Sequence, residues 1–248
     1  MHPLFAACHL AMACLRALLV SECKLVAMRA SITGQGVMAV LPRTEATLRV
    51  PSRHNSGIVA IGHSGGSSWD NIGVDVRYDD SVFIHPSAHL YGHILLGDEC
   101  SVWPNVVIRS EMFEVRVGAR TNIQDFVMIH IGFKLPTIIG EDCSITHHAI
   151  LHGCTIGHRT LIGINATVMD GAVIGANSVV AGNAIVAENA EFPDNSIIAG
   201  VPAKVVATRD NAAANVTNAR FYRRNAQNYM RGIERMSDED MRWINGEG

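Results

Sequence analysis

The sequence has few aromatic side chains and no excess of charge of either sign. Aromatic residues make up 6% of its 248 residues, and 20 Lys and Arg stand against 23 Asp and Glu. The lack of a basic surplus argues against nucleic acid as a partner. Val, Ile, Ala and Gly are plentiful instead, which favours strands and frequent turns over a helical bundle. We therefore expect an all-β body.

Long apolar runs and paired cysteines are also missing. No uninterrupted apolar stretch reaches about 18 residues, and LAMACLRALLV (residues 10–20) is broken by Arg16, so no membrane span is expected. The six cysteines form no CxxC pair, which argues against a thiolate zinc site or a redox motif and favours a reducing compartment, the cytoplasm.

The N-terminal residues differ in composition from the rest. Residues 1–43 carry four basic residues and one acid, a balance that also fits an organellar targeting peptide. We interpret residues 1–72 as a dispensable leader whose flexible end is HSGGSSWDN, residues 63–71.

From residue 84 onward the chain repeats with a period of six. An aliphatic residue takes the same place in each hexad, and the phase slips only at SEMFEVR, at GFKLP and at residues 153–155. The aliphatic positions are Ile84, Leu90, Leu96, Val102, Ile108, Val117, Ile123, Ile129, Ile139, Ile145, Leu151, Ile156, Ile162, Val168, Ile174, Val180 and Val186.

A second column supports the same frame. Four positions after the aliphatic residue, the chain places small or β-branched residues: Ala88, Cys100, Val106, Thr121, Val127, Cys143, Ala149, Thr160, Ala166, Ala172, Ser178 and Ala184. This pattern is typical of a left-handed parallel β-helix with about 18 residues per coil, whereas a helix would need apolar spacing of three and four. It predicts a β-helix domain over residues 73–207, with Cys100 and Cys143 as inward core fillers.

The last segment, residues 208–248, is predicted to be helical. Tyr222, Ala226, Tyr229, Met230 and Ile233 form one apolar stripe, which predicts a helix over residues 218–236. SDED, residues 237–240, predicts the capped start of a final short helix.

Three of the twelve histidines stand out within the repeat. His130 and His152 each follow the aliphatic residue of a hexad, and their separation of 22 is one coil plus the four residues that GFKLP adds. The two side chains are therefore expected on adjacent rungs, ~4.8 Å apart, where two imidazoles can share a metal. His147 lies on the preceding face of the three-sided coil. It is therefore better placed to complete a metal site with the coil of a neighbouring subunit. A metal shared between subunits of a homotrimer is indicated, with ordinary surface histidines as the alternative.

Several motifs resemble those of a known family. VWPNVVIRSE, GARTNIQD, MIH, HHAILHGCTIG and VMDGAVIG resemble the γ-class carbonic anhydrase group of hexapeptide-repeat proteins, which includes carnitine- and phenylacetate-operon relatives. The resemblance covers residues 74–236. It implies a β-helix homotrimer with Zn²⁺, or Fe²⁺ or Co²⁺, at each subunit interface. His130 and His152 would be the same-chain ligands, and His147 would be the ligand given to the neighbour.

The resemblance also implies roles near the metal. Gln124, in NIQD, would hydrogen-bond the metal-bound water or bicarbonate, with Asn122 supporting it, and Tyr229 would lean over the metal. Arg109 and Asp125 match an ion-pair network across the interface, for which a purely structural role is the alternative.

Four places depart from the family pattern. Arg-Ser-Glu at residues 109–111 stands where Arg-Gly-Asp or Arg-Ser-Asp is common, so the interface geometry is expected to shift by a methylene. Met112 and the acid-free IGFKLP loop replace acidic residues that serve proton transfer in archaeal members. His148 replaces a glycine and is a candidate proton shuttle, because imidazole titrates near neutral pH.

Three functions follow as hypotheses. The leading one is metal-dependent, reversible hydration of CO2 to bicarbonate. The second is acyl transfer or thioester hydrolysis on a coenzyme A substrate, in which one histidine acts as general base. The third is a scaffold subunit that keeps the trimer and the metal for stability.

Overall fold

The computed structural model describes residues 71–247. The targeting peptide and nearly all of the predicted leader lie outside these residues, so those predictions stay untested. Within the described residues, no helix combines the length and the apolarity that a membrane crossing requires. Ile72 already belongs to the coil, because it forms a parallel bridge with Leu90.

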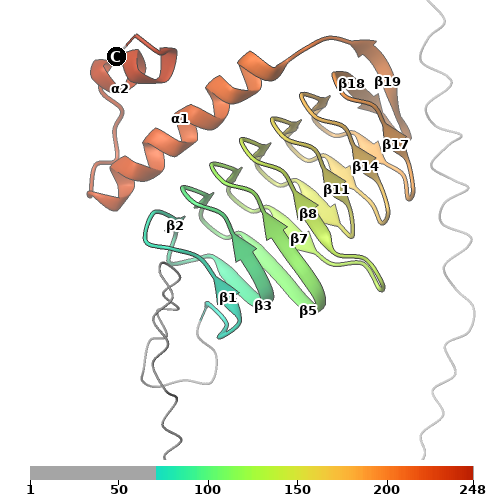
Figure 1. Cartoon of the computed structure of the whole chain (residues 1–248), viewed down its shortest axis with the longest axis horizontal. Helices are drawn as coiled ribbons and strands as arrows, with labels where there is room; N and C mark the ends of the chain where they lie inside the picture. Colours follow the sequence, from blue (N-terminus) through green and yellow to red (C-terminus); the bar gives the residue numbers. More distant parts are fainter. Residues whose placement is uncertain (1–70, 248) are drawn as a thin grey trace, which may run out of the picture. The chain divides into compact units, whose positions relative to one another are not determined.

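The described chain is a coil of short strands followed by two helices (Figure 1). Strand pairs are parallel along the coil, and β18 pairs antiparallel with β19. The strands are β1 (Val76–Arg77), β2 (Phe83–Ile84), β3 (His89–Leu96), β4 (Ser101–Val102), β5 (Val107–Val117), β6 (Asn122–Ile123), β7 (Met128–His130), β8 (Thr137–Ile139), β9 (Ser144–Ile145), β10 (Ile150–His152), β11 (Thr155–Ile156), β12 (Leu161–Ile162), β13 (Thr167–Val168), β14 (Val173–Ile174), β15 (Val179–Val180), β16 (Ile185–Val186), β17 (Glu191–Phe192), β18 (Ser196–Gly200) and β19 (Ala203–Thr208). The helices are α1 (Ala212–Met230) and α2 (Asp238–Asn245).

The hexad frame is confirmed. All the predicted aliphatic positions are buried except Ile84, which is half-buried, and every position of the small-residue column is buried. Apart from the buried polar residues Thr121, Thr160 and Ser178, these side chains form or pack against one continuous apolar cluster inside the coil. The fold is therefore the predicted left-handed parallel β-helix, in which inward side chains stack rung upon rung.

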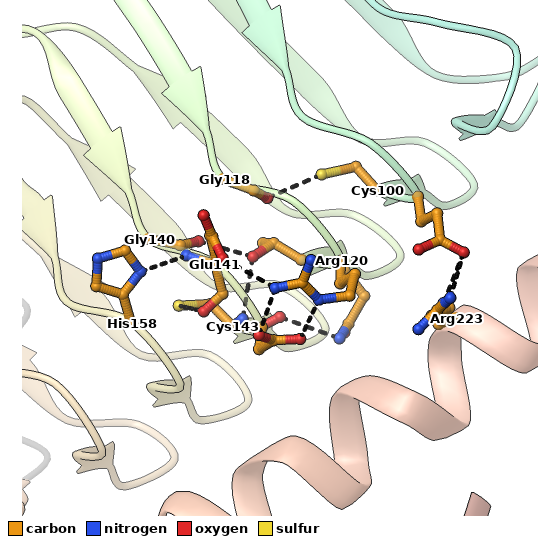
Figure 2. A network of polar contacts seen from close by, with 12 residues as sticks. Cys100, Gly118, Arg120, Gly140, Glu141, Cys143, His158 and Arg223 are labelled. Carbon is orange, nitrogen blue, oxygen red and sulfur yellow. Dashed lines mark hydrogen bonds and ion pairs between the residues drawn. The ribbon is translucent and has the colours of Figure 1, made fainter.

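The two cysteines predicted as core fillers are buried, as expected. The Cys100 thiol donates to the carbonyl oxygen of Gly118 at 3.0 Å, and that of Cys143 to Gly157 at 3.2 Å. Cys100 and Cys143 occupy the same corner two coils apart, with the coil of Thr121 between them (Figure 2). Burial raises the pKa of both thiols to about 12, so they stay protonated and unreactive at neutral pH.

Helix α1 begins and ends earlier than predicted: it spans Ala212–Met230 rather than residues 218–236. Its first turns contact the coil through polar residues. A prediction based on apolar spacing therefore misses them. Buried Asn215 donates to the carbonyl oxygens of Arg159 and Ser178 at 2.7 and 3.0 Å. At the other end Gly232 has a φ of +76°, and Ile233 lies beyond the helix, 44% exposed.

Helix α1 lies along the coil and contacts β2, β4, β6 and β9 (Figure 1). Tyr222 and Ala226 pack on Phe83 and Trp103. Arg223 adds an ion pair with Glu99, at 2.5 Å (Figure 2). The coil and the helix thus form one body, which fixes the side chains that α1 presents to the coil.

The short final helix is confirmed as α2. Ser237 accepts from the backbone N–H of Asp240, and the Asp240 carboxylate accepts from Ser237 in return, which is a capping box. Asp240 also accepts from Arg224 and Asn228 of α1. Hydrogen bonds from Ser237, and then from Arg224, lower the pKa of Asp240, so its carboxylate ties α2 to α1.

Candidate metal centre

His130 and His152 lie side by side on adjacent rungs, as predicted. Strand β7 pairs with β10 so that His130 stands opposite His152. The ring centroids are 5.0 Å apart, and His130 Nδ1 lies 3.1 Å from His152 Nε2. The four residues that GFKLP adds to the repeat therefore leave the two histidines in one column.

A carboxylate stands behind each of these two rings. Glu111 Oε2 accepts from His130 Nε2 at 2.9 Å, and Asp170 Oδ1 accepts a short hydrogen bond from His152 Nδ1. An ionised carboxylate only accepts hydrogen bonds, so in the neutral rings these two nitrogens carry the protons. Glu111, His130, His152 and Asp170 are called the paired-histidine group below.

The electronic state of the paired-histidine group suits a metal ion. His130 Nδ1 and His152 Nε2 are left with lone pairs that face each other at 3.1 Å, and two lone pairs repel unless they share a cation. The separation is shorter than two Zn–N bonds of ~2.0–2.1 Å, so one ion can bond to both nitrogens. The residues present thus fit two of the ligands of a histidine-bound metal.

Glu111 connects His130 with Arg109. Its carboxylate is 2.5 Å from the Arg109 guanidinium. Partial burial raises the pKa of Glu111, but the hydrogen bond from His130 and the charge of Arg109 outweigh burial and lower it overall. One carboxylate thus contacts both Arg109 and His130.

His147 lies elsewhere, at the corner that follows β9. Its Nδ1 is 3.0 Å from Asp125 Oδ2, and its Nε2 is 3.4 Å from the hydroxyl of Tyr222 on α1. Burial raises the pKa of Tyr222, and the Asp125 charge adds to the effect, so the hydroxyl stays protonated and able to donate to Nε2. Tyr222 was not predicted, because the repeat carries no signal for a residue of α1.

Gln124 and Asn122 lie on the rung next to that of His147, because β6 pairs with β9, and both are almost fully buried. Gln124 Nε2 donates to Asn122 Oδ1 at 2.9 Å, and Asn122 Nδ2 donates to Ser144 Oγ at 2.9 Å. Asn122 therefore holds the amide of Gln124, as expected. Gln124, Asp125, His147 and Tyr222 are called the corner-histidine group below.

The two groups do not meet in one chain. Among residues 71–247, no set of three or more His, Cys, Asp or Glu side chains is arranged to hold a metal ion. Within one chain Arg109 pairs with Glu111 and Asp125 with His147, so the expected network of Arg109 and Asp125 across the subunit interface stays a prediction.

Comparison with known proteins places the chain in a family. Residues 153–188 match the family model "Bacterial transferase hexapeptide (six repeats)". Over 126 residues the chain is 48% identical to the "Probable carbonic anhydrase" of Methanocaldococcus jannaschii, and the match covers 51% of this chain and 79% of that one. The chain belongs to the γ-carbonic-anhydrase-like family of hexapeptide-repeat proteins.

Other members of the γ-carbonic-anhydrase-like family match over shorter stretches. The chain is 43% identical to "Protein YrdA" of Escherichia coli over 96 residues, covering 36% of this chain and 52% of the relative. It is 41% identical to "Gamma carbonic anhydrase 1, mitochondrial" of Arabidopsis thaliana over 99 residues, covering 38% and 36%. The chain thus spans about half or less of the length of these two relatives.

A solved structure supports the fold of this family member. The hexapeptide transferase family protein of Anaplasma phagocytophilum matches with a TM-score of 0.60 at 27% identity, covering 64% of this chain and 98% of that one. Proteins named as carbonic anhydrases and proteins named as transferases thus share this fold. The fold alone therefore does not decide the reaction.

Two further residues singled out from the family pattern occupy distinct places. Tyr229 packs against the rings of both Phe83 and Trp103, with centroid distances of 5.9 and 5.2 Å. His148 stacks face to face on Phe126 at 4.8 Å, and both have a positive φ of about 60° at the same corner of successive coils. Within one chain, Tyr222 rather than Tyr229 is the tyrosine that contacts a predicted ligand.

Proposed function

We propose that this γ-carbonic-anhydrase-like chain forms a homotrimer that binds a divalent metal ion at each subunit interface and catalyses the reversible hydration of CO2 to bicarbonate. The observation that carries the proposal is the convergence of His130 Nδ1 and His152 Nε2, with a carboxylate behind each ring. His147 of a second copy supplies the third histidine, because His147 lies in a separate group of its own chain. Zn²⁺ is the expected ion, and Fe²⁺ or Co²⁺ also accept imidazole ligands.

A zinc ion held by these histidines supplies Lewis acidity that lowers the pKa of water to about 7. The chain's own residues orient the reactants. Gln124 donates one N–H to Asn122. Its oxygen and its second N–H are left to align the attacking water and bicarbonate. His148, exposed on the corner next to His147, accepts the released proton and passes it to buffer.

Sharing of the metal is tested by mixing two variants. His147→Ala keeps the paired-histidine group, and His152→Ala keeps the corner-histidine group, so each variant alone is expected to lose its metal. In trimers assembled from equal amounts of both, about one interface in four joins two intact halves, because each half is supplied by a different copy. Elemental analysis is expected to recover about a quarter of the wild-type metal, and CO2 hydration should return in parallel.

The matched control mixes His130→Ala with His152→Ala, which both damage the same half and should restore nothing. Hydration is measured with zinc and, anaerobically, with iron. Restoration of metal by the control pair would contradict the shared site. Metal-loaded wild type with no more hydration than His147→Ala would contradict the anhydrase activity and favour the scaffold role.

Acyl transfer on coenzyme A is the second candidate. It is favoured by the Asp125–His147 contact, in which a carboxylate on Nδ1 leaves Nε2 as a general base. The chain's match to a transferase family model and to a hexapeptide transferase structure points the same way. Saturable binding of acetyl-CoA by metal-free protein, lost in His147→Ala, would support this reaction, and no binding would count against it.

A further inference from the structure

We propose that Asp170 is a positioning residue that holds His152 in one tautomer, and that Gly132 and Gly153 lack side chains so that the Asp170 carboxylate can reach the ring. Asp170 follows β13 on the rung next to that of His152. Because Ile150 of β10 pairs with Thr167 of β13, Asp170 lies one residue past the position directly opposite His152. The inference takes its purpose from the proposed metal site, but the contacts that carry it involve protein atoms alone.

The hydrogen bond decides which nitrogen of His152 is available. Asp170 Oδ1 accepts from His152 Nδ1, so the ring proton stays on Nδ1 and the lone pair of Nε2 faces His130. In the other tautomer Nε2 would carry the proton and would present a donor where a ligand atom is needed. A carboxylate behind a ligating imidazole fixes its tautomer and makes it a stronger ligand.

The position of the carboxylate depends on two glycines of adjacent rungs. A Cβ on Gly153 would lie 2.8 Å from Asp170 Oδ1, and a Cβ on Gly132 would lie 3.1 Å from Asp170 Oδ2. Gly153 also has a φ of +53°, which favours glycine by itself. Gly132 is not among the glycines with positive φ in the described residues, so its missing side chain is explained by space rather than by backbone conformation. The Asp170 carboxylate takes part of the volume that side chains at these two positions would need, and at Gly153 the backbone of Gly132 takes the rest.

The corner is also tied to the neighbouring rung through its backbone. The N–H of Gly171 donates to the carbonyl oxygen of Gly153 at 2.8 Å, and the N–H of Gly153 donates to that of His130 at 3.1 Å. Three rungs, carrying His130, His152 and Asp170, are thus locked in one register next to the rings. A fixed carboxylate on a fixed backbone is what a positioning role requires.

The test compares Asp170→Ala with Asp194→Ala. Asp194 also occupies a corner, where it accepts from the backbone N–H of Ala176 at 2.7 Å, so its loss controls for general corner damage. Nitrogen-15 NMR of histidine-labelled, metal-free full-length protein reports the tautomer, and His152→Gln assigns the signal. Wild type and Asp194→Ala are expected to show His152 with its proton on Nδ1, whereas Asp170→Ala populates both tautomers.

Zn²⁺ affinity, measured by competition with a chelator, gives the second readout. Asp170→Ala is expected to bind Zn²⁺ about 10- to 100-fold more weakly, and Asp194→Ala to match wild type. Gly132→Ala, which crowds the carboxylate without touching a ligand, should fall between them. An unchanged tautomer in Asp170→Ala, or an equal loss in Asp194→Ala, would overturn the proposal. A changed tautomer in Asp170→Ala, in a protein whose wild type binds no metal, would support the positioning role while contradicting the proposed function.

Discussion

The paired-histidine group and the corner-histidine group differ in how many imidazole nitrogens they offer to a metal ion. In the first, two imidazoles on neighbouring strands turn their lone pairs toward each other. In the second, one imidazole is held between Asp125 and the hydroxyl of Tyr222. Catalytic zinc commonly takes three protein ligands, so neither group suffices alone. The repeat places two histidines side by side because equivalent positions on adjacent rungs stack. A third ligand must come from a different face of the coil.

Removing a member of the pair is expected to have the largest effect. His152→Ala leaves one histidine in its group, and metal content should fall from about three ions per trimer to near none. His147→Ala keeps the pair, so it should bind Zn²⁺ weakly although little metal survives purification. Elemental analysis and titration with Zn²⁺ separate the two variants. Full Zn²⁺ affinity in His147→Ala would show that the corner-histidine group is not part of the site.

Gln124→Ala separates chemistry from metal binding. Gln124 contacts Asn122 and none of the predicted ligands, so metal content should stay at the wild-type level. Loss of a fixed polar group at the reacting atoms typically costs about 10²-fold in rate, and CO2 hydration should fall by about that factor. Stopped-flow hydration on metal-matched samples measures it. An unchanged rate would remove Gln124 from the catalytic residues.

Asp125→Ala tests whether the corner histidine needs its carboxylate as much as the pair does. His147 Nδ1 would lose its acceptor, and Zn²⁺ binding is expected to weaken about 10-fold. The effect should be smaller than that of Asp170→Ala, because the Tyr222 hydroxyl still contacts the ring. Chelator competition on both variants gives the comparison, and a larger loss in Asp125→Ala would reverse the order.

The sequence predicted the coil and the place of the pair because both follow from one period. Inward residues recur every six positions, and His130 and His152 share a column once the GFKLP insertion is counted. The same count does not find Asp170, because the repeat is one residue short at residues 153–155. Ile150 pairs with Thr167, so the register places Met169 opposite His152 and Asp170 one residue further on. Glu111 is harder to place, because the longer corner at SEMFEVR shifts the count between rungs.

The sequence could not predict what α1 contributes. Its N-terminal half packs on the coil through Asn215 and Asn218, whose amides bond to the coil, so no apolar stripe marks the contact. The stripe used for the prediction placed the helix too far along the chain, and Tyr222 and Tyr229 looked alike within it. Which tyrosine reaches His147 depends on how the helix lies on the coil, and the sequence alone does not determine that.

The smallest expected effect distinguishes these two tyrosines. Tyr222→Phe removes a hydroxyl at 3.4 Å from His147 Nε2, a long contact whose loss should cost up to about 1 kcal/mol, or about fivefold in Zn²⁺ affinity or hydration. Tyr229→Phe keeps the ring that packs on Phe83 and Trp103, so metal binding, hydration and melting temperature should all stay at wild-type values. Both variants conserve ring volume, so they are matched in their effect on packing. If Tyr229→Phe slowed hydration while Tyr222→Phe did not, Tyr229 would be the tyrosine over the metal of a neighbouring copy, as the family resemblance implies, and the hydroxyl of Tyr222 would serve only to hold His147.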